Sequence, residues 1–171
     1  MKAINIKDES PKEGQIVLLR HAYRKNNPKD SAVWYEGRHC KGKFLNRQWM
    51  YHYNKDIWEP DEFCFEDCDT KTRGMYKVTH WADLPTEITP ADNCLPKNGM
   101  NILIRMAWKE DADKPDNVGI WYEGEHNKCE YYYHVWGYSK EHLVFMCHRL
   151  GVDKRFDITH VANMPVMEKV L

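Results

Sequence analysis

Short segments in which apolar and polar residues alternate occur along much of the chain, and this period of two is typical of half-buried β-strands. In "GQIVLLR" Val17 and Leu19 share one face, and in "GMNILIR" Ile102 and Ile104 do the same. The other face holds Ile16 in the first segment but a polar residue in the second, so we predict that the Val17 face packs into a core. No segment shows a clear helical period, and strands are therefore the main element expected.

These two segments open the two copies of an internal repeat. Three blocks occur twice and in the same order: "SPKEGQIVLLR" with "LPKNGMNILIR", "AVWYEG" with "GIWYEG", and "YKVTHWADLP" with "FDITHVANMP". The spacing between the blocks differs little between the copies, which indicates a tandem duplication. We predict two domains, residues 1–87 and 88–171, joined through the proline-bracketed link "PTEITP".

Each copy predicts the same series of elements. "PKEG" and "PKNG" predict turns, because proline presets φ and glycine accepts a positive φ. A strand follows, then a polar loop, the WYEG strand, aromatic-rich stretches that favour strands, and a short strand around Thr-His that a proline ends. The stretch "EPDEFCFEDCDTKTRG" (59–74) is expected to add a helical turn or two. The predicted fold is mainly β, with β-rich α+β as the alternative: two small antiparallel β domains of three to five strands, SH3-like or built as a bent sheet or barrel.

The strand "AVWYEG" leaves two arrangements open, because neighbouring side chains of a strand point to opposite faces. If Val33 marks the core, Trp34 and Glu36 stand together on the outer face, where an indole beside a carboxylate could hold a base, a cation or a partner's side chain. If Trp34 is the core residue, Glu36 ends the strand at a rim and Gly37 makes the turn. The same choice applies to the second copy.

Composition narrows the classes of function. The 25 Lys and Arg residues against 26 Asp and Glu residues leave a net charge of -1, so no global field attracts nucleic acid, and such a partner is not expected. No apolar run is long enough to span a bilayer and "MKAINIKDES" lacks the core of a signal peptide, so we expect a cytoplasmic location and no membrane partner. The 7 Trp, 10 Tyr and 5 Phe residues favour an ordered β protein and also suit binding surfaces.

Six histidines occupy matching places in the two copies and could ligate a metal in threes. The pairs are His39 with His126, His52 with His134, and His80 with His160. The alternative is structural, with each Thr-His pair satisfying backbone groups at a strand end, and under this preferred interpretation no metal or cofactor is expected. Cys64 and Cys68, four residues apart, form a further zinc candidate, whereas the irregular spacing of the cysteines predicts free thiols.

The sequence contains no recognisable catalytic motif. Glu36 and Glu123 would act as a carboxylate pair only if both copies brought them to one cleft, and nothing in the sequence sets their separation. The chain contains no P-loop, Rossmann glycine pattern, Gly-x-Ser-x-Gly elbow or His-Glu-x-x-His run. We therefore expect a protein that is not an enzyme.

The first and last blocks of the repeat carry a family resemblance. "LPKNGMNILIR" and "VTHWADLP" resemble the two ends of a family of small bacterial and phage proteins, domain of unknown function 551. The first copy departs from the family with Ser10 in place of leucine, and the second with Val161 in place of tryptophan. The resemblance implies no enzymatic activity. It implies a phage or prophage accessory protein, a class whose members often bind and inhibit host factors or act against host defence.

Three hypotheses of function follow. The first is a non-catalytic protein that binds and inhibits a host protein, with an anti-defence role as one form of it. The second is a module that sequesters a small nucleotide-like ligand between the copies by stacking and guanidinium contacts. The third is a metal-dependent enzyme that uses the histidines. The candidate binding residues are Trp34, Glu36, Trp121, Glu123, Arg20 and Arg105.

Overall fold

The computed structural model describes the backbone of residues 1–23, 32–52, 57–65, 76–91, 96–108, 119–127, 130–136, 143–148 and 156–167. These residues form antiparallel β-sheet, which confirms the mainly β class predicted from the sequence. The chain divides into two compact units, Met1–Leu84 with Pro165–Leu171, and Pro85–Met164. A tandem pair of domains with limits at 1–87 and 88–171 stays a prediction.

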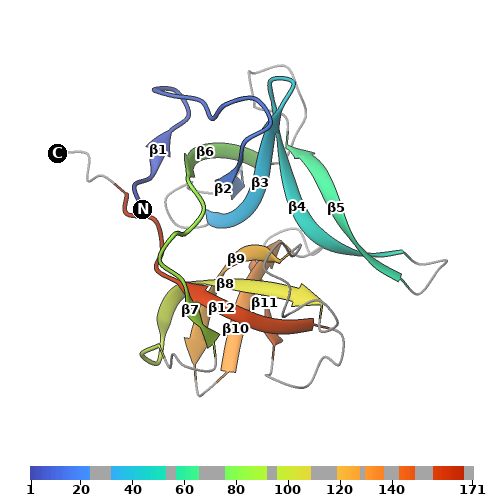
Figure 1. The fold of residues 1–171 in the computed structure, drawn as a ribbon, viewed down its shortest axis with the longest axis vertical. Coiled ribbons are helices and arrows are strands. Elements are labelled where there is room, and N and C mark those ends of the chain that lie inside the picture. The colour runs from blue at the N-terminus through green and yellow to red at the C-terminus, as the bar shows by residue number, and fades with distance from the viewer. Residues whose placement is uncertain are drawn as a thin grey trace. The chain divides into compact units, whose positions relative to one another are not determined.

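In the described part of the first unit, the strands lie in the order β1-β6-β2-β3-β4-β5, and each is antiparallel to its neighbours (Figure 1). The strands are β1 (Ile4–Asn5), β2 (Ile16–Tyr23), β3 (Val33–Cys40), β4 (Lys43–His52), β5 (Ile57–Phe65) and β6 (Tyr76–Ala82). Among these strands β1 and β5 do not pair with each other, so the described sheet of this unit is open and does not close into a barrel.

The described strands of the second unit pair in the equivalent order, β7-β12-β8-β9-β10-β11. They are β7 (Thr89–Pro90), β8 (Met100–Trp108), β9 (Ile120–Asn127), β10 (Glu130–Trp136), β11 (Leu143–His148) and β12 (Phe156–Ala162). The registers agree as well, because Arg20 lies opposite Trp34 and Arg105 lies opposite Trp121. The three to five strands expected per copy were too few, since the two-residue strands β1 and β7 are too short to show an alternating pattern.

The turns that precede β2 and β8 have the predicted glycine conformation. Gly14 and Gly99 have positive φ values of 78° and 76°, which glycine adopts without steric cost. Their N–H groups donate to the main-chain carbonyls of His39 and His126, both at 2.7 Å, and so fix each turn to the following strand pair. The two-residue turn between β3 and β4 has positive φ at both positions, 54° and 69°, as in a type I′ hairpin.

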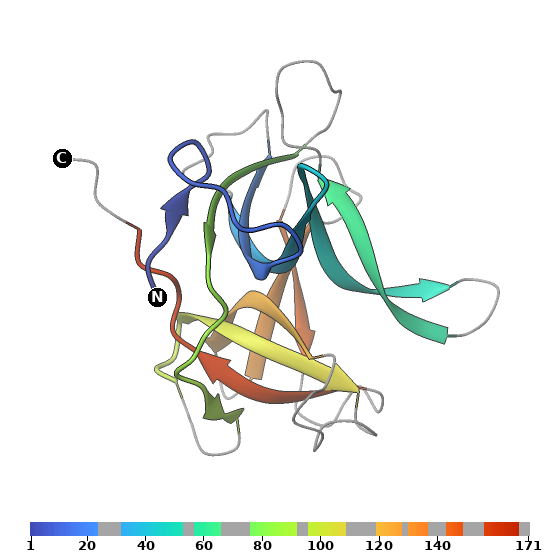
Figure 2. The ribbon, with the colours of Figure 1, turned by 45° about the horizontal axis from the view of Figure 1, so that its top comes forward.

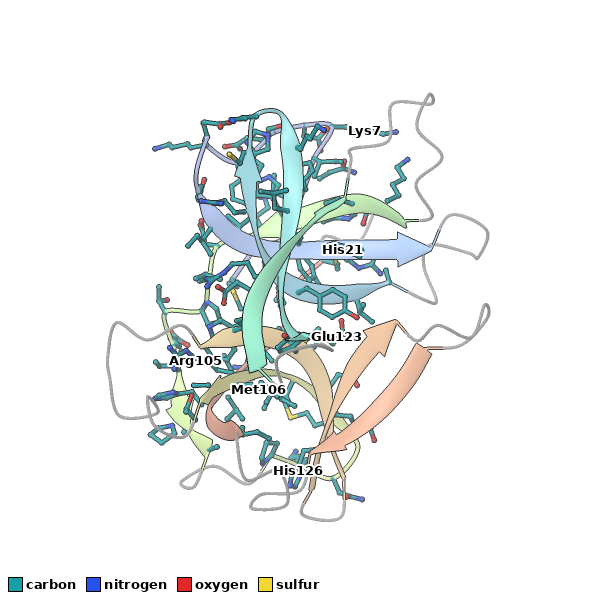
Figure 3. All side chains as sticks on the ribbon, turned by 90° about the vertical axis from the view of Figure 1, so that its right-hand side faces the viewer. Lys7, His21, Arg105, Met106, Glu123 and His126 are labelled. Carbon is teal, nitrogen blue, oxygen red and sulfur yellow. The ribbon has the colours of Figure 1, made fainter. Side chains whose placement is uncertain are left out.

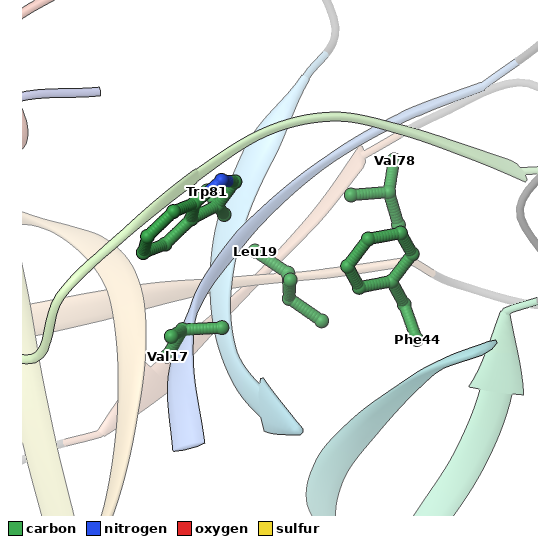
Figure 4. Packing of buried hydrophobic residues seen from close by; sticks show 5 residues of the cluster. All are labelled: Val17, Leu19, Phe44, Val78 and Trp81. Atoms are coloured by element: carbon green, nitrogen blue, oxygen red, sulfur yellow. The ribbon is translucent and has the colours of Figure 1, made fainter. Parts of the chain in front are cut away.

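The core of the first unit lies on the face of β2 that the alternation predicted. The core cluster consists of Val17, Leu19, Phe44, Val78 and Trp81 (Figure 4). Val17 and Leu19 are fully buried, whereas Ile16 on the other face is 42% exposed, so the predicted core face is confirmed. Ile102 and Ile104 are buried in the second unit in the same way.

The stretch expected to be helical forms a strand where it is described. Residues 57–65 make up β5, which pairs with β4 along its whole length in a long twisted hairpin (Figure 2). The prediction of a helical turn is wrong for these residues, because β4 supplies hydrogen-bond partners that an acidic helix-start pattern does not take into account. Residues 66–74 lie outside the described residues.

The segment at Val166 lies beside the start of the chain in the first unit (Figure 1). Lys2 and Val166 form a parallel β-bridge. The Ala3 N–H donates to the Val166 carbonyl at 3.0 Å, and the Val166 N–H donates to the Met1 carbonyl at 3.0 Å. The C-terminal segment is thereby joined by backbone hydrogen bonds to the start of the chain.

Candidate functional site

Cross-strand pairing decides which side chains of the WYEG motif lie together. Tyr35 lies opposite Leu19, so Tyr35 and Val33 share the face of the hydrophobic core. Trp34 lies opposite Arg20 and therefore points, with Glu36, to the other face. We call this second face the Trp–Glu face. Its centre in the first unit consists of Leu18, Arg20, Trp34, Glu36, His80 and Ala82.

The motif is buried on both faces of the strand. Trp34 and Trp121 are 3% and 5% exposed, and Glu36 and Glu123 are buried as well. The first alternative is correct that Trp34 and Glu36 share a face opposite Val33, and the second is correct that Trp34 is buried. Val33 marks the core face and Trp34 stands beside Glu36, yet neither tryptophan forms an indole platform open to solvent.

Gly37 lies within β3 and does not make a turn, so that part of the sequence interpretation is wrong. A Cβ at this position would overlap Cδ1 of Leu19 and the main-chain oxygen of Leu45. The glycine of the motif is therefore required by close packing across the strands, and its conformational freedom is not the reason for it.

Glu36 is a buried carboxylate with a cation beside it. Arg47 on β4 donates from Nη1 to Oε1 of Glu36 at 2.6 Å. Their side chains are 16% and 3% exposed, so solvent screens this ion pair only weakly. Arg47 is not among the sequence-predicted site residues, because the partner of Glu36 lies on another strand and no spacing rule identifies it.

The strand registers correct one histidine pairing. Gly37 lies opposite Asn46, and the equivalent Gly124 lies opposite Tyr133. His134 therefore occupies the strand position that corresponds to Arg47, so matching it with His52 was wrong.

The predicted histidine triads are divided between two faces. His39 lies on the core face, where its ring centroid is 5.1 Å from that of Phe44, and His80 lies on the Trp–Glu face. His126 and His160 are divided in the same way, so neither pair can ligate one metal. Within the described residues no group of three or more His, Cys, Asp or Glu side chains could hold a metal ion. The side chains of His52, His134 and Cys64, and the whole of Cys68, lie outside the described residues.

The same pair of hydrogen bonds between an arginine and a threonine occurs in both units at the half-buried part of the Trp–Glu face. The histidines differ, because His80 Nδ1 lies 3.1 Å from Thr79 Oγ1, within hydrogen-bond distance, whereas His160 Nδ1 is buried without such a partner among the described residues. Arg20 Nη1 donates to Thr79 Oγ1 at 3.4 Å, and this hydroxyl donates to the Arg20 carbonyl at 3.4 Å. Arg105 Nη1 donates to Thr159 Oγ1 at 3.2 Å, and this hydroxyl donates to the Arg105 carbonyl at 3.4 Å. Each threonine lies at a β-bulge, which re-aims its side chain towards the arginine.

A histidine completes each cluster, since His80 lies opposite Arg20 and His160 lies opposite Arg105 (Figure 3 labels Arg105). Burial and the neighbouring Arg20 lower the pKa of His80 below its ordinary value, against a smaller opposite effect of Asp8. Burial and Arg105 likewise lower the pKa of His160. Both imidazoles are therefore neutral at neutral pH, with one ring nitrogen as donor and one as acceptor. We call each set of arginine, threonine and histidine an Arg–Thr–His cluster.

The structure thus places residues from two different sequence predictions in one cluster. Arg20 and Arg105 are candidates from the sequence for binding a ligand, and His80 and His160 beside them are candidate metal ligands. The two threonines were missed as site residues, although their presence in both Thr-His blocks was a usable signal.

The two faces of the sheet differ in how much they vary between the units. The six central pairs of the Trp–Glu face are identical: Leu18 and Leu103, Arg20 and Arg105, Trp34 and Trp121, Glu36 and Glu123, His80 and His160, Ala82 and Ala162. The core face keeps the Tyr and Gly of the motif and the pair His39 and His126, but it differs in these pairs: Val17 and Ile102, Leu19 and Ile104, His21 and Met106, Val33 and Ile120, Val78 and Ile158, Trp81 and Val161. Identity is therefore concentrated on the Trp–Glu face.

Comparison with protein-family models, with curated proteins and with solved structures finds no match. The resemblance to domain of unknown function 551 therefore stays a prediction. In the part of the chain that the structure describes, no helix is both long and apolar enough to cross a membrane.

Proposed function

We propose that the protein is a non-catalytic accessory protein of a phage or mobile element that binds a host protein and inhibits it. One observation carries the proposal: each unit ends its described sheet in a strand that is paired on one side. Among the described strands β5 pairs with β4 alone, and β11 pairs with β10 alone. The unpaired edge of such a strand offers N–H and C=O groups to an extended segment of another protein.

The sequence of β5 narrows the chemistry of the partner. Its nine residues include Glu59, Asp61 and Glu62 but no lysine or arginine, so a basic extended segment is the complementary partner. Pro60 lacks an N–H donor, which limits continuous pairing to the part of the strand that follows it. The partner segment is therefore expected to pair mainly along residues 61–65.

The test is affinity capture from a bacterial lysate with three forms of the full chain. One variant reverses the charge of β5 through Glu59→Lys, Asp61→Lys and Glu62→Lys. The control makes the same charge change at exposed positions outside β5: Glu9→Lys, Asp83→Lys and Glu87→Lys. We expect one host protein that the wild type and the control recover and the β5 variant loses.

Two outcomes would contradict parts of this proposal. Repeated recovery of no host protein by the wild type would reject the binding function. Equal recovery by the β5 variant would reject the strand edge as the docking site.

A second candidate function is the sequestering of a small anionic ligand. It is favoured by the cross-strand pairing of Arg20 with Trp34 and of Arg105 with Trp121 on one face, which places an arginine opposite a tryptophan in each unit. Native mass spectrometry of lysate-exposed protein should reveal a retained ligand of discrete mass. Preparations that consistently have the mass of the bare chain would count against this function.

A further inference from the structure

We infer that each unit binds one oxyanion of the phosphate type at its Arg–Thr–His cluster. This inference rests on the second candidate function and specifies its site, with one site in each unit. It is independent of the proposed protein partner.

The chemistry of the cluster matches a phosphate oxygen. The arginine guanidinium carries a permanent charge and presents N–H donors in a fork that fits an oxyanion. Its hydrogen bond to the threonine at the β-bulge holds it at the strand surface in both units, so part of the ordering cost of binding is met before a ligand arrives. A neutral imidazole opposite the arginine can donate a further hydrogen bond without adding a competing anion.

The position of the cluster keeps it accessible. Arg20, Thr79 and His80 are half-buried, whereas Leu18 and Ala82 on the same face are completely buried. An anion can therefore approach the guanidinium and the imidazole, while the buried Trp34 lies opposite the arginine in the same cross-strand row.

The pattern of identity supports a shared task for these residues. Core positions accept one apolar side chain for another, and the two units have used that freedom at most core pairs. The arginine, threonine and histidine are the same in both units, together with the hydrogen bonds between arginine and threonine. Half-buried positions tolerate more kinds of side chain than fully buried core positions do. The identity of these three residues in both units therefore points to a common ligand chemistry.

Differences between the units predict that the two sites bind phosphate with different affinities. In the first unit, Asp8 is joined by a main-chain hydrogen bond to Asn5, which lies opposite His80, so its carboxylate opposes an incoming anion. In the second unit the Arg105 guanidinium lies over Gly119, where a Cβ would overlap it, whereas the first unit has Ala32 at this position. We therefore expect the second unit to bind phosphate more tightly.

The experiment is an NMR titration of the full chain with inorganic phosphate at constant pH and ionic strength, with chloride as the control anion. The imidazole resonances of His80 and His160 report the two sites separately. Both should shift to saturation with phosphate but not with chloride. Asp8→Asn should tighten binding at the first site by about two- to fivefold, as removal of one solvent-screened charge allows, and leave the second site unchanged.

Gly119→Ala provides the matched test in the second unit. It keeps every charge and displaces only the flexible end of Arg105, so the protein is expected to fold normally. We expect a loss of about threefold or more in phosphate affinity at His160 and no change at His80, as misplacing one charge-assisted hydrogen bond predicts.

The inference would be overturned by the absence of a saturable phosphate shift, by equal shifts with chloride, or by a Gly119→Ala variant with unchanged affinity. If phosphate does not bind but native mass spectrometry still finds a retained ligand, the sequestering function stands and only this site is rejected.

Discussion

The replacement of His21 by methionine tests how one buried imidazole limits stability in acid. His21 is completely buried on the core face of β2, with its ring edge-on to Tyr35 at a centroid distance of 5.4 Å. Met106 occupies the same register position in the second unit. Both residues are marked in Figure 3. The protein thus contains its own reference for an apolar residue at this site.

The magnitude follows from proton linkage. Burial lowers the pKa of His21 from 6.5 to about 3. Below pH 6.5 the unfolded chain therefore binds a proton at this residue that the folded chain does not, and the folded state loses stability as the pH falls from 6.5 towards 3. From neutral pH down to about pH 5 the loss from this one residue is about 2 kcal/mol.

Urea unfolding followed by tryptophan fluorescence at neutral pH and at about pH 5 would measure the effect. His21→Met should reduce the difference in unfolding free energy between the two conditions by about 2 kcal/mol. At neutral pH the variant should stay within about 1 kcal/mol of the wild type, because the loss of the aromatic contact with Tyr35 is offset by the burial of an apolar side chain. Met106→His should increase the pH dependence by a similar amount. Identical pH dependence in all three proteins would refute the argument.

Three further predictions concern the packing of the first unit. Arg47→Met should lower the free energy of unfolding by about 3–5 kcal/mol because it leaves the buried Glu36 without this cation. The added substitution Glu36→Gln should recover most of the loss. Urea unfolding that shows the double variant to be no more stable than the single one would contradict this. Gly37→Ala should cost roughly 1–3 kcal/mol by overlap with Leu19, and an unchanged urea midpoint would show that the strands can move apart. Val166→Pro removes the N–H that donates to the Met1 carbonyl and should cost roughly 1 kcal/mol, with faster amide exchange near the chain start. Unaltered exchange there would count against a stabilising contact between Val166 and the start of the chain.

The candidate site was only partly accessible to sequence reasoning. The repeat pointed to Arg20 and to the Thr-His block, because identical residues at equivalent places need no knowledge of the fold. It could not show that the two lie opposite each other on adjacent strands, or that a β-bulge turns Thr79 towards the arginine. The interpretation of the histidines as a triad failed because counting along the chain does not reveal which face of the sheet a residue occupies.

Sequence by itself determined the strand class, the core face of β2 and the glycine turns. These features follow from local alternation and from the φ preferences of proline and glycine, which act over a few residues. Only the tertiary structure decided that Trp34 is buried although it points away from the core cluster, that Arg47 neutralises Glu36, and that residues 57–65 form a strand. The physical reason is the same in each case: burial, ion pairing and β-pairing depend on groups that lie far away in the chain, and alternation assigns a side chain to a face without showing what covers that face.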